Sequence, residues 1–126
     1  MSTVKSDLRY TVDHDWVNSD SPARVGISDY AQNQLGEIVY AELPEVGDEV
    51  TAGEECAELE STKSVAELQA PVTGTVAEVN EALLDNPELI NDDPYGEGWL
   101  YSVTVSAEGP LKTAEEYAEV VGGTVE

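Results

Sequence analysis

Short Val-rich runs separated by Gly, Pro, Asn and Asp recur along nearly the whole chain, and this spacing constrains the fold more than any other feature. Runs of a few residues bounded by turn-forming residues are typical of strands that end in tight corners. Many such strands in one chain favour a barrel or a sandwich. The predicted strands are Tyr10–Val12, Trp16–Val17, Arg24–Ile27, Glu37–Leu43, Glu49–Val50, Glu55–Glu60, Val65–Ala70, Thr75–Val79 and Trp99–Val105.

Turn and helix signals divide these strands. Turns are predicted at Asn18–Pro22, Pro44–Asp48, Val72–Gly74 and Pro94–Gly98. A stretch from Pro44 to Val50 resembles one from Pro71 to Val76, so a Pro, turn Gly and Val pattern occurs twice and flanks the segment between them.

Three helices are expected, all short. Ser28 can cap a helix over Asp29–Leu35, with Gly36 in the left-handed conformation that ends it. Asn80 can cap a turn over Glu81–Leu84. The last helix begins with a capping box of Thr113 and Glu116 and stops at Gly122-Gly123, and it is expected to pack Tyr117 and either Val120 or Val121 on the barrel.

The segment Glu55–Ala70 predicts a hairpin with Thr62 and Lys63 as its two central turn residues. In that register Leu59 faces Ala66, Ala57 faces Leu68, Glu60 faces Val65, and Glu58 faces Glu67. The four apolar side chains then share one face, as a half-buried hairpin requires. Glu58 and Glu67 form a like-charge pair that costs stability at low salt.

The consequence of this register is a lysine at the apex of a hairpin. A lysine presented on a tight turn between small hydroxyl residues gives a modifying enzyme free access to the amine. Geometry alone leaves open that Lys63 is an ordinary surface lysine. The only other lysines are Lys5 and Lys112.

The charge balance excludes several classes of partner. The chain has 126 residues, with 27 acidic and 5 basic side chains and a net charge of −22. This length suits one domain, spanning residues 1–126. Nucleic acid and anionic membrane would be repelled. We expect a protein adapted to very high salt, where self-repulsion is screened, as in a halophile.

Other classes of chemistry have little support in the composition. One cysteine and one histidine cannot make an internal disulfide or a Cys/His zinc site, so no metal site is expected. His14 is expected to pack or hydrogen-bond rather than act as a base, and Cys56 to be inert. The chain has no long apolar run and no secretory pattern at its start, which indicates a cytoplasmic protein without a membrane span.

The chain resembles the H proteins of the glycine cleavage system over about its whole length and in the family's order. The matching stretches are Asp13–Val17, Val25–Gln32, Leu35–Val39, Glu42–Gly47, Glu60–Ser64, Ala70–Gly74, Val79–Leu83, Asn86–Asn91 and Pro94–Leu100. Thr62 and Ser64 depart from the valine and alanine that frequently flank the family's lysine, which could alter recognition by the lipoylating enzyme.

This resemblance implies a mainly β barrel-sandwich hybrid of the lipoyl and biotinyl hammerhead type, with short helices and a C-terminal helix, carrying lipoate on Lys63. It implies a non-catalytic carrier that shuttles an aminomethyl group, and we expect a monomer, which suits a shuttle that visits three enzymes. The implied partners are the lipoylating enzyme, the P protein, which is a pyridoxal-phosphate glycine decarboxylase, the T protein, which is an aminomethyltransferase, and the L protein, which is a dihydrolipoamide dehydrogenase.

The resemblance also implies a cleft that holds the loaded arm away from water. Glu67, Asp13 and Asp15 are candidates by matched position for holding its amine, against the alternative that they are merely acids on an acidic surface. Asp15 stands where the family commonly has another acid.

Rival classes stay open. A biotin carrier usually has methionines around its lysine, whereas the only methionine here is Met1. The lipoyl domains of 2-oxo acid dehydrogenase acyltransferases lack the Trp16 segment and the terminal helix. The last alternative is a lipoyl-domain-like scaffold, or a protein that relays lipoate to 2-oxo acid dehydrogenase systems.

Overall fold

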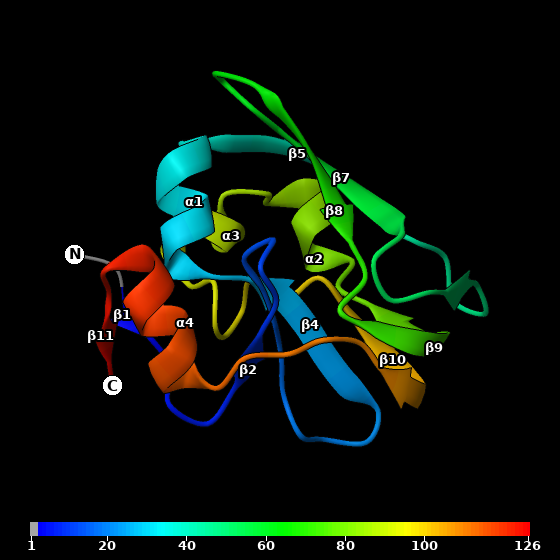
Figure 1. Ribbon diagram of the computed structural model, residues 1–126. Coiled ribbons are helices and arrows are strands. Elements are labelled where there is room, and N and C mark those ends of the chain that lie inside the picture. Colours follow the sequence, from blue (N-terminus) through cyan, green and yellow to red (C-terminus); the bar gives the residue numbers. More distant parts are fainter. Residues whose placement is uncertain (1–2) are drawn as a thin grey trace.

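Two sheets enclose the main core, and a two-stranded sheet joins the chain ends (Figure 1). The computed structural model describes residues 3–126. Its strands are β1 (Thr3–Val4), β2 (Arg9–Tyr10), β3 (Asp15–Val17), β4 (Ala23–Ile27), β5 (Ile38–Glu42), β6 (Glu49–Val50), β7 (Glu55–Ser61), β8 (Val65–Gln69), β9 (Val72–Val79), β10 (Tyr101–Glu108) and β11 (Thr124–Val125). Its helices are α1 (Asp29–Leu35), α2 (Ala82–Asp85), α3 (Leu89–Asp92) and α4 (Ala114–Val121).

The order of strands confirms the mainly β sandwich class. Six strands pair in the order β2-β3-β4-β10-β9-β6, and three pair in the order β5-β7-β8. Apolar side chains from both sheets meet in one buried cluster, which includes Val25 and Val103 from the first sheet and Leu59 and Leu68 from the second. Burial of this shared face supplies the hydrophobic stabilisation that holds the two sheets together.

A second buried cluster, called here the terminal cluster, lies beside the first. Tyr10 stacks on Tyr117 with ring centroids 4.5 Å apart, and Trp16 donates its indole N–H to the Pro94 carbonyl at 3.0 Å. The members of the terminal cluster are Val4, Leu8, Tyr10, Trp16, Ala114, Tyr117 and Ala118.

The chain ends close this cluster. Strands β1 and β11 pair in parallel, and α4 packs beside them (Figure 1). The sequence did not predict this pair, because two-residue strands carry too little periodicity to detect. Helix α4 begins at the predicted capping box and ends at Gly122 in the left-handed conformation. Tyr117 is fully buried and Val121 packs on the terminal cluster, whereas Val120 is 57% exposed.

The predicted turn at Val72–Gly74 is wrong. These residues begin β9, and a Cβ at Gly74 would collide with the Thr104 carbonyl oxygen of the neighbouring strand. Gly74 is therefore required for close approach of two backbones rather than for a corner. The two echoed stretches pair with each other: Gly47 N–H donates to the Val76 carbonyl and Val76 N–H to the Asp48 carbonyl, both at 2.8 Å.

Two of the helix ends differ from expectation. Gly36 has φ +79° as predicted, but its ψ of −157° lies outside the left-handed helical region. Asn80 does not cap α2 with its side chain; it donates instead to the Glu97 and Trp99 carbonyls, both at 2.8 Å. Helix α3 was not predicted, because one turn between Pro87 and Pro94 carries no helical period.

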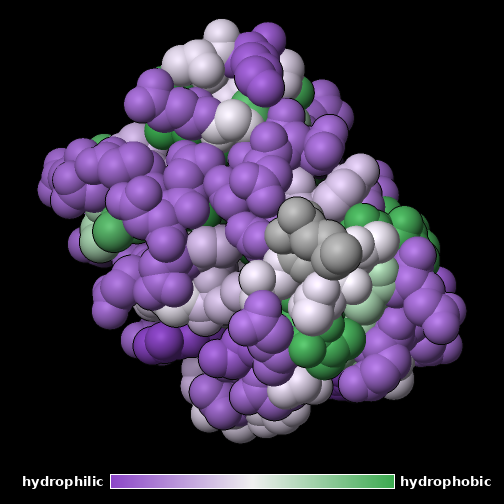
Figure 2. All heavy atoms as spheres, turned by 90° about the vertical axis from the view of Figure 1, so that its left-hand side faces the viewer, coloured by the Kyte–Doolittle hydropathy of each residue, from purple (hydrophilic) through white to green (hydrophobic). Residues whose placement is uncertain are grey.

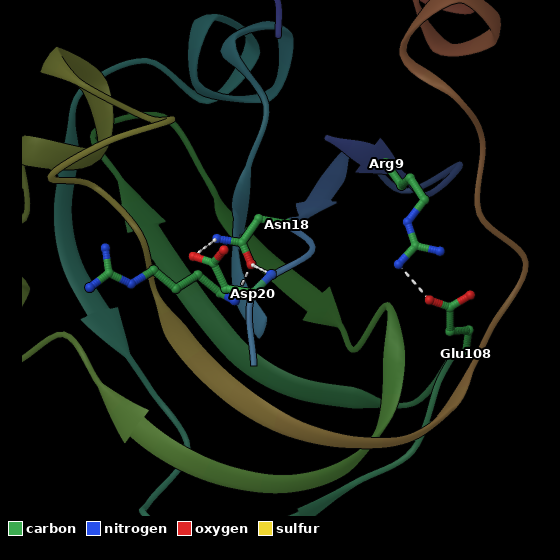
Figure 3. A network of polar contacts seen from close by, with 5 residues as sticks. Arg9, Asn18, Asp20 and Glu108 are labelled. Carbon is green, nitrogen blue, oxygen red and sulfur yellow. Dashed lines mark hydrogen bonds and ion pairs between the residues drawn. The ribbon is translucent and has the colours of Figure 1, made fainter. Parts of the chain in front are cut away.

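Polar side chains stabilise the turn before β4 and link β2 to the end of β10 (Figure 3). Asn18 Oδ1 accepts from the Arg24 N–H at 2.8 Å and from the Asp20 N–H at 3.2 Å, which closes the predicted turn before β4. Arg9 on β2 forms an ion pair with Glu108 at the end of β10. Within residues 3–126 this is the only ion pair, so most acids lack a cationic partner.

Figure 2 shows the face around the termini as mostly hydrophilic, with apolar residues in small patches. None of the helices in the described part of the chain has the length and apolar character to span a bilayer. No group of three or more metal-ligating side chains within those residues is placed to hold a metal ion.

Candidate functional site

The hairpin of β7 and β8 has the predicted register. Ala57 pairs with Leu68, Leu59 with Ala66, Glu58 with Glu67 and Glu60 with Val65. The pairing shifts only near Cys56, where β7 bulges.

Ser61 closes the turn at the tip of this hairpin. The Ser61 N–H donates to the Ser64 carbonyl at 2.8 Å, and the Ser61 hydroxyl accepts from the backbone N–H groups of Lys63 and Ser64 at 3.2 and 3.1 Å. These bonds satisfy the backbone without the Asn-Gly sequence that two-residue turns usually need.

The tip is also attached to the body of the protein. The Thr62 N–H donates to the Glu37 carbonyl at 3.1 Å, which places the tip above the C-terminal end of α1 (Figure 1). The Lys63 side chain is exposed and lies over Gly36, where a Cβ would come within 3.3 Å of Lys63 Cε. Because Gly36 has no side chain, the lysine stem can rest there.

A cavity of about 290 Å³ opens between α1 and β8. Lys63 stands near one end of it, since its stem lies over the residue that follows α1 and β8 begins two residues after it. The cavity combines apolar walls with acids at its rim, and its lining residues are Asp13, His14, Ile27, Tyr30, Ala31, Gln34, Leu35, Ala66, Glu67 and Leu68.

The structure separates the three candidate acids. Asp13 and Glu67 both line this cavity and are exposed. Asp15 is only 2% exposed and is not among the lining residues. Burial raises the pKa of the Asp15 carboxyl well above its usual value, and the nearby Asp13 charge adds to the effect. Within residues 3–126 its Oδ2 atom has no hydrogen-bond partner.

The outer face of the three-stranded sheet carries a row of acids, called here the acidic row: Glu42, Glu58 and Glu67 lie directly opposite one another on β5, β7 and β8. The predicted like-charge pair of Glu58 and Glu67 is therefore present. Glu67, Glu58 and Glu42 all act on the adjacent Glu55 and raise the pKa of its carboxyl, with Glu67 the largest cause.

His14 takes part in a hydrogen-bond network that the sequence did not reveal. Its Nδ1 atom lies 2.8 Å from the Tyr117 hydroxyl, which lies 2.6 Å from the Ser28 hydroxyl. The three residues are far apart in sequence, so no local pattern could have shown the contact. The finding confirms that His14 packs and hydrogen-bonds.

Cys56 lies against Tyr101 and has a structural role. The Cys56 thiol lies 3.0 Å from the Tyr101 hydroxyl, and burial raises the pKa of the thiol to about 11. A thiol that stays protonated at neutral pH is a weak nucleophile. Tyr101 is fully buried, whereas Trp99, two residues before it, is partly exposed and lies beneath the Arg24 guanidinium.

Known proteins share both the sequence and this fold. Residues 8–123 match the family model described as glycine cleavage H-protein. A glycine cleavage system H protein of Corynebacterium aurimucosum is 51% identical over 97% of this chain and 98% of its own length. One from Mycobacterium avium is 53% identical over 90% of this chain and 88% of its own.

A solved structure agrees with these relatives. The crystal structure of a glycine cleavage system H protein from Mycobacterium marinum matches with a TM-score of 0.90 and 50% sequence identity, covering 93% of this chain and 98% of that one. The similarity extends over nearly the full length of the chain. The chain therefore belongs to the glycine cleavage H-protein family.

Proposed function

We propose that this chain is the lipoyl-bearing, non-catalytic carrier of a glycine cleavage system, with residues 1–126 forming one carrier domain. The observation that carries the proposal is the placement of Lys63: an exposed amine on a fastened two-residue turn, beside a cavity with acids at its rim. Family membership supplies the reaction class.

The residues around Lys63 fit a lipoyl group. The amine is exposed and can form an amide, and Gly36 leaves room for the stem. The cavity offers apolar surface from Ile27, Leu35 and Leu68 to a dithiolane ring. When bound, lipoate would supply the disulfide that accepts the aminomethyl group from glycine and later releases it.

The chain itself would hold and shield the amine of the carried aminomethyl group. This amine is positively charged when protonated, and Asp13 and Glu67 place carboxylates at the cavity rim that can bind it. The apolar walls exclude water, which slows hydrolytic loss of the carried group. The Asp15 carboxyl is buried behind the cavity wall. We therefore propose that it influences the cavity from the protein interior and does not contact the amine of the carried group.

The partners would meet a strongly acidic protein. We propose that the P, T and L proteins and a lipoylating enzyme act on Lys63 in the cytoplasm, and that the carrier visits them as a monomer. With a net charge of −22, docking would depend on apolar contacts and would strengthen with salt. Adaptation to high salt remains part of this proposal, and the relatives named above do not bear on it.

Two measurements test the proposal: lipoylation of the chain, and glycine decarboxylation with the partner enzymes. Intact mass of the chain made in a lipoylating host should show one added lipoyl group, which Lys63→Ala removes and Lys5→Ala keeps. With P, T and L proteins, Lys63→Ala should lose all glycine decarboxylation. Decarboxylation supported by Lys63→Ala at the rate of Lys5→Ala would overturn the carrier function.

The role of the two acids has its own test. Asp13→Asn and Glu67→Gln should each shorten the retention of the carried aminomethyl group by about two- to fivefold, because each loses one exposed ion pair with the amine. Glu58→Gln is the matched control, because Glu58 lies opposite Glu67 in the acidic row but does not line the cavity. Equal retention in all three variants would contradict the assignment.

A further inference from the structure

His14 is held in an unusual backbone conformation at the cavity wall. Its φ is +73°, the only positive value at a non-glycine position within residues 3–126. Such a conformation persists only where the surroundings fix it. Here the His14 N–H donates to the Thr11 carbonyl at 3.2 Å, and the His14 carbonyl accepts from the Ser28 N–H at 2.9 Å.

The same Ser28 begins a chain of side-chain hydrogen bonds that ends on the ring of His14. The Ala31 N–H donates to Ser28 Oγ at 3.2 Å. Ser28 is fully buried, and among the described residues the only other partner of its Oγ is the Tyr117 hydroxyl at 2.6 Å. The Tyr117 hydroxyl in turn lies 2.8 Å from His14 Nδ1.

Counting donors fixes the direction of these bonds. Donation by a buried hydroxyl is strongly favoured, because leaving its proton unbonded costs about 1–3 kcal/mol. Within residues 3–126 the Tyr117 oxygen is the only acceptor in reach of the Ser28 proton, so the Tyr117 proton is directed to His14 Nδ1. Nδ1 is then an acceptor, and the ring proton sits on Nε2.

We infer that Tyr117 of α4 holds His14 as the neutral Nε2–H tautomer, so that the C-terminal helix sets which hydrogen-bonding group the cavity presents. Nδ1 is occupied by Tyr117, which leaves Nε2 as the ring nitrogen available to an occupant of the cavity. An N–H at that position suits an acceptor atom of the arm, such as its amide oxygen. A protonated amine, which only donates, is left to Asp13 and Glu67. This consequence rests on the proposed function.

The surroundings of His14 agree with a neutral ring. Tyr30 of α1 packs against it at 4.9 Å between ring centroids, and Tyr117 packs on another side at 5.7 Å. Burial lowers the pKa of His14, and the opposing attraction of Asp13 is the smaller cause. Glu67 is the other acid that lines the same cavity.

Protonation of Nδ1 would also reverse the network. Tyr117 could no longer donate to His14 Nδ1. The Tyr117 and Ser28 protons would then both point between the two hydroxyl oxygens, where only one of them can be accepted. The network therefore disfavours the imidazolium form independently of burial.

The test uses the fact that the chain has a single histidine, so ring signals need no assignment. Long-range ¹H–¹⁵N NMR of the full chain, with and without lipoylation, should show the proton on Nε2 above the pKa of His14. In Tyr117→Phe the tautomer preference should weaken, and the pKa should rise by about 0.5 to 1 unit, the equivalent of one hydrogen bond to the neutral ring. Retention of the carried group should shorten by about two- to tenfold in that variant.

Tyr10→Phe is the matched control, because it removes a hydroxyl from the same ring stack, where Tyr10 bonds the Lys5 carbonyl rather than His14. It should leave tautomer and pKa unchanged. A wild-type ring protonated on Nδ1 would overturn the inference without any variant, as would a Tyr117→Phe spectrum equal to wild type. A bare Lys63 would overturn the proposed function and leave the tautomer result standing.

Discussion

The hairpin of β7 and β8 and the terminal cluster are built in opposite ways. The hairpin joins residues that are close in sequence, and its turn is fixed by bonds within Ser61–Ser64. The terminal cluster joins the two ends of the chain through β1, β11 and α4. Local structure presents the lysine, whereas a long-range contact, between Tyr117 of α4 and His14, shapes the wall of the cavity.

The largest expected effect is on the free energy of unfolding, and it distinguishes the terminal cluster from the hairpin tip. Trp16→Ala removes the largest fully buried side chain of the terminal cluster and should lower the free energy of unfolding by about 3–5 kcal/mol. Lys63→Ala changes an exposed side chain and should alter it by less than about 0.5 kcal/mol. Urea titrations of both variants check this, and equal losses would break the comparison.

The next effect concerns the platform under the lysine. Gly36→Ala should cost about 1–3 kcal/mol, because φ +79° with ψ −157° strains any side chain. It should also displace the Lys63 stem and slow lipoylation. Gly53→Ala is the control, with φ +86° and open space around its Cβ. If Gly53→Ala slowed lipoylation as much, the contact with Gly36 would not matter.

A gain in stability is expected at the buried acid. The pKa of Asp15 is raised in the folded state, so that state binds its proton more tightly and stability falls as the pH rises from the unfolded pKa through the folded one. Asp15→Asn should remove this loss and make the chain more stable than wild type at neutral pH. Thermal unfolding between pH 4 and 8 decides this, and a less stable variant at neutral pH would refute it.

The smallest expected effect lies in the acidic row. Like charges facing each other on β5, β7 and β8 repel, and salt screens the repulsion. Glu58→Gln should add about 0.5 kcal/mol in dilute buffer and almost nothing in molar salt. Wild-type stability should rise over the same range. If the stability of the wild type were independent of salt, the proposed adaptation to high salt would be contradicted.

The sequence predicted what short-range rules determine. The hairpin register followed from the alternation of Ala57, Leu59, Ala66 and Leu68, and both ends of α4 followed from its capping residues. The predicted turn at Gly74 failed because glycine serves turns and close backbone contacts alike.

The cavity wall needed the folded chain. Asp15 is close to Asp13 in sequence, yet the start of β3 turns its carboxyl into the interior, which composition cannot show. The contact of His14 with Tyr117 joins residues 103 positions apart. The sequence therefore indicated Asp13 and Glu67, which both line the cavity, and left the hydrogen bonding of the cavity wall undetermined.

The most direct test of the central claim is the mass of the lipoylated chain after exposure to glycine and P protein alone. We expect a gain equal to one methylamine, located by peptide mapping on the modified Lys63 and absent in Lys63→Ala. A lipoylated chain whose mass stays unchanged while the enzyme releases carbon dioxide from glycine would contradict it.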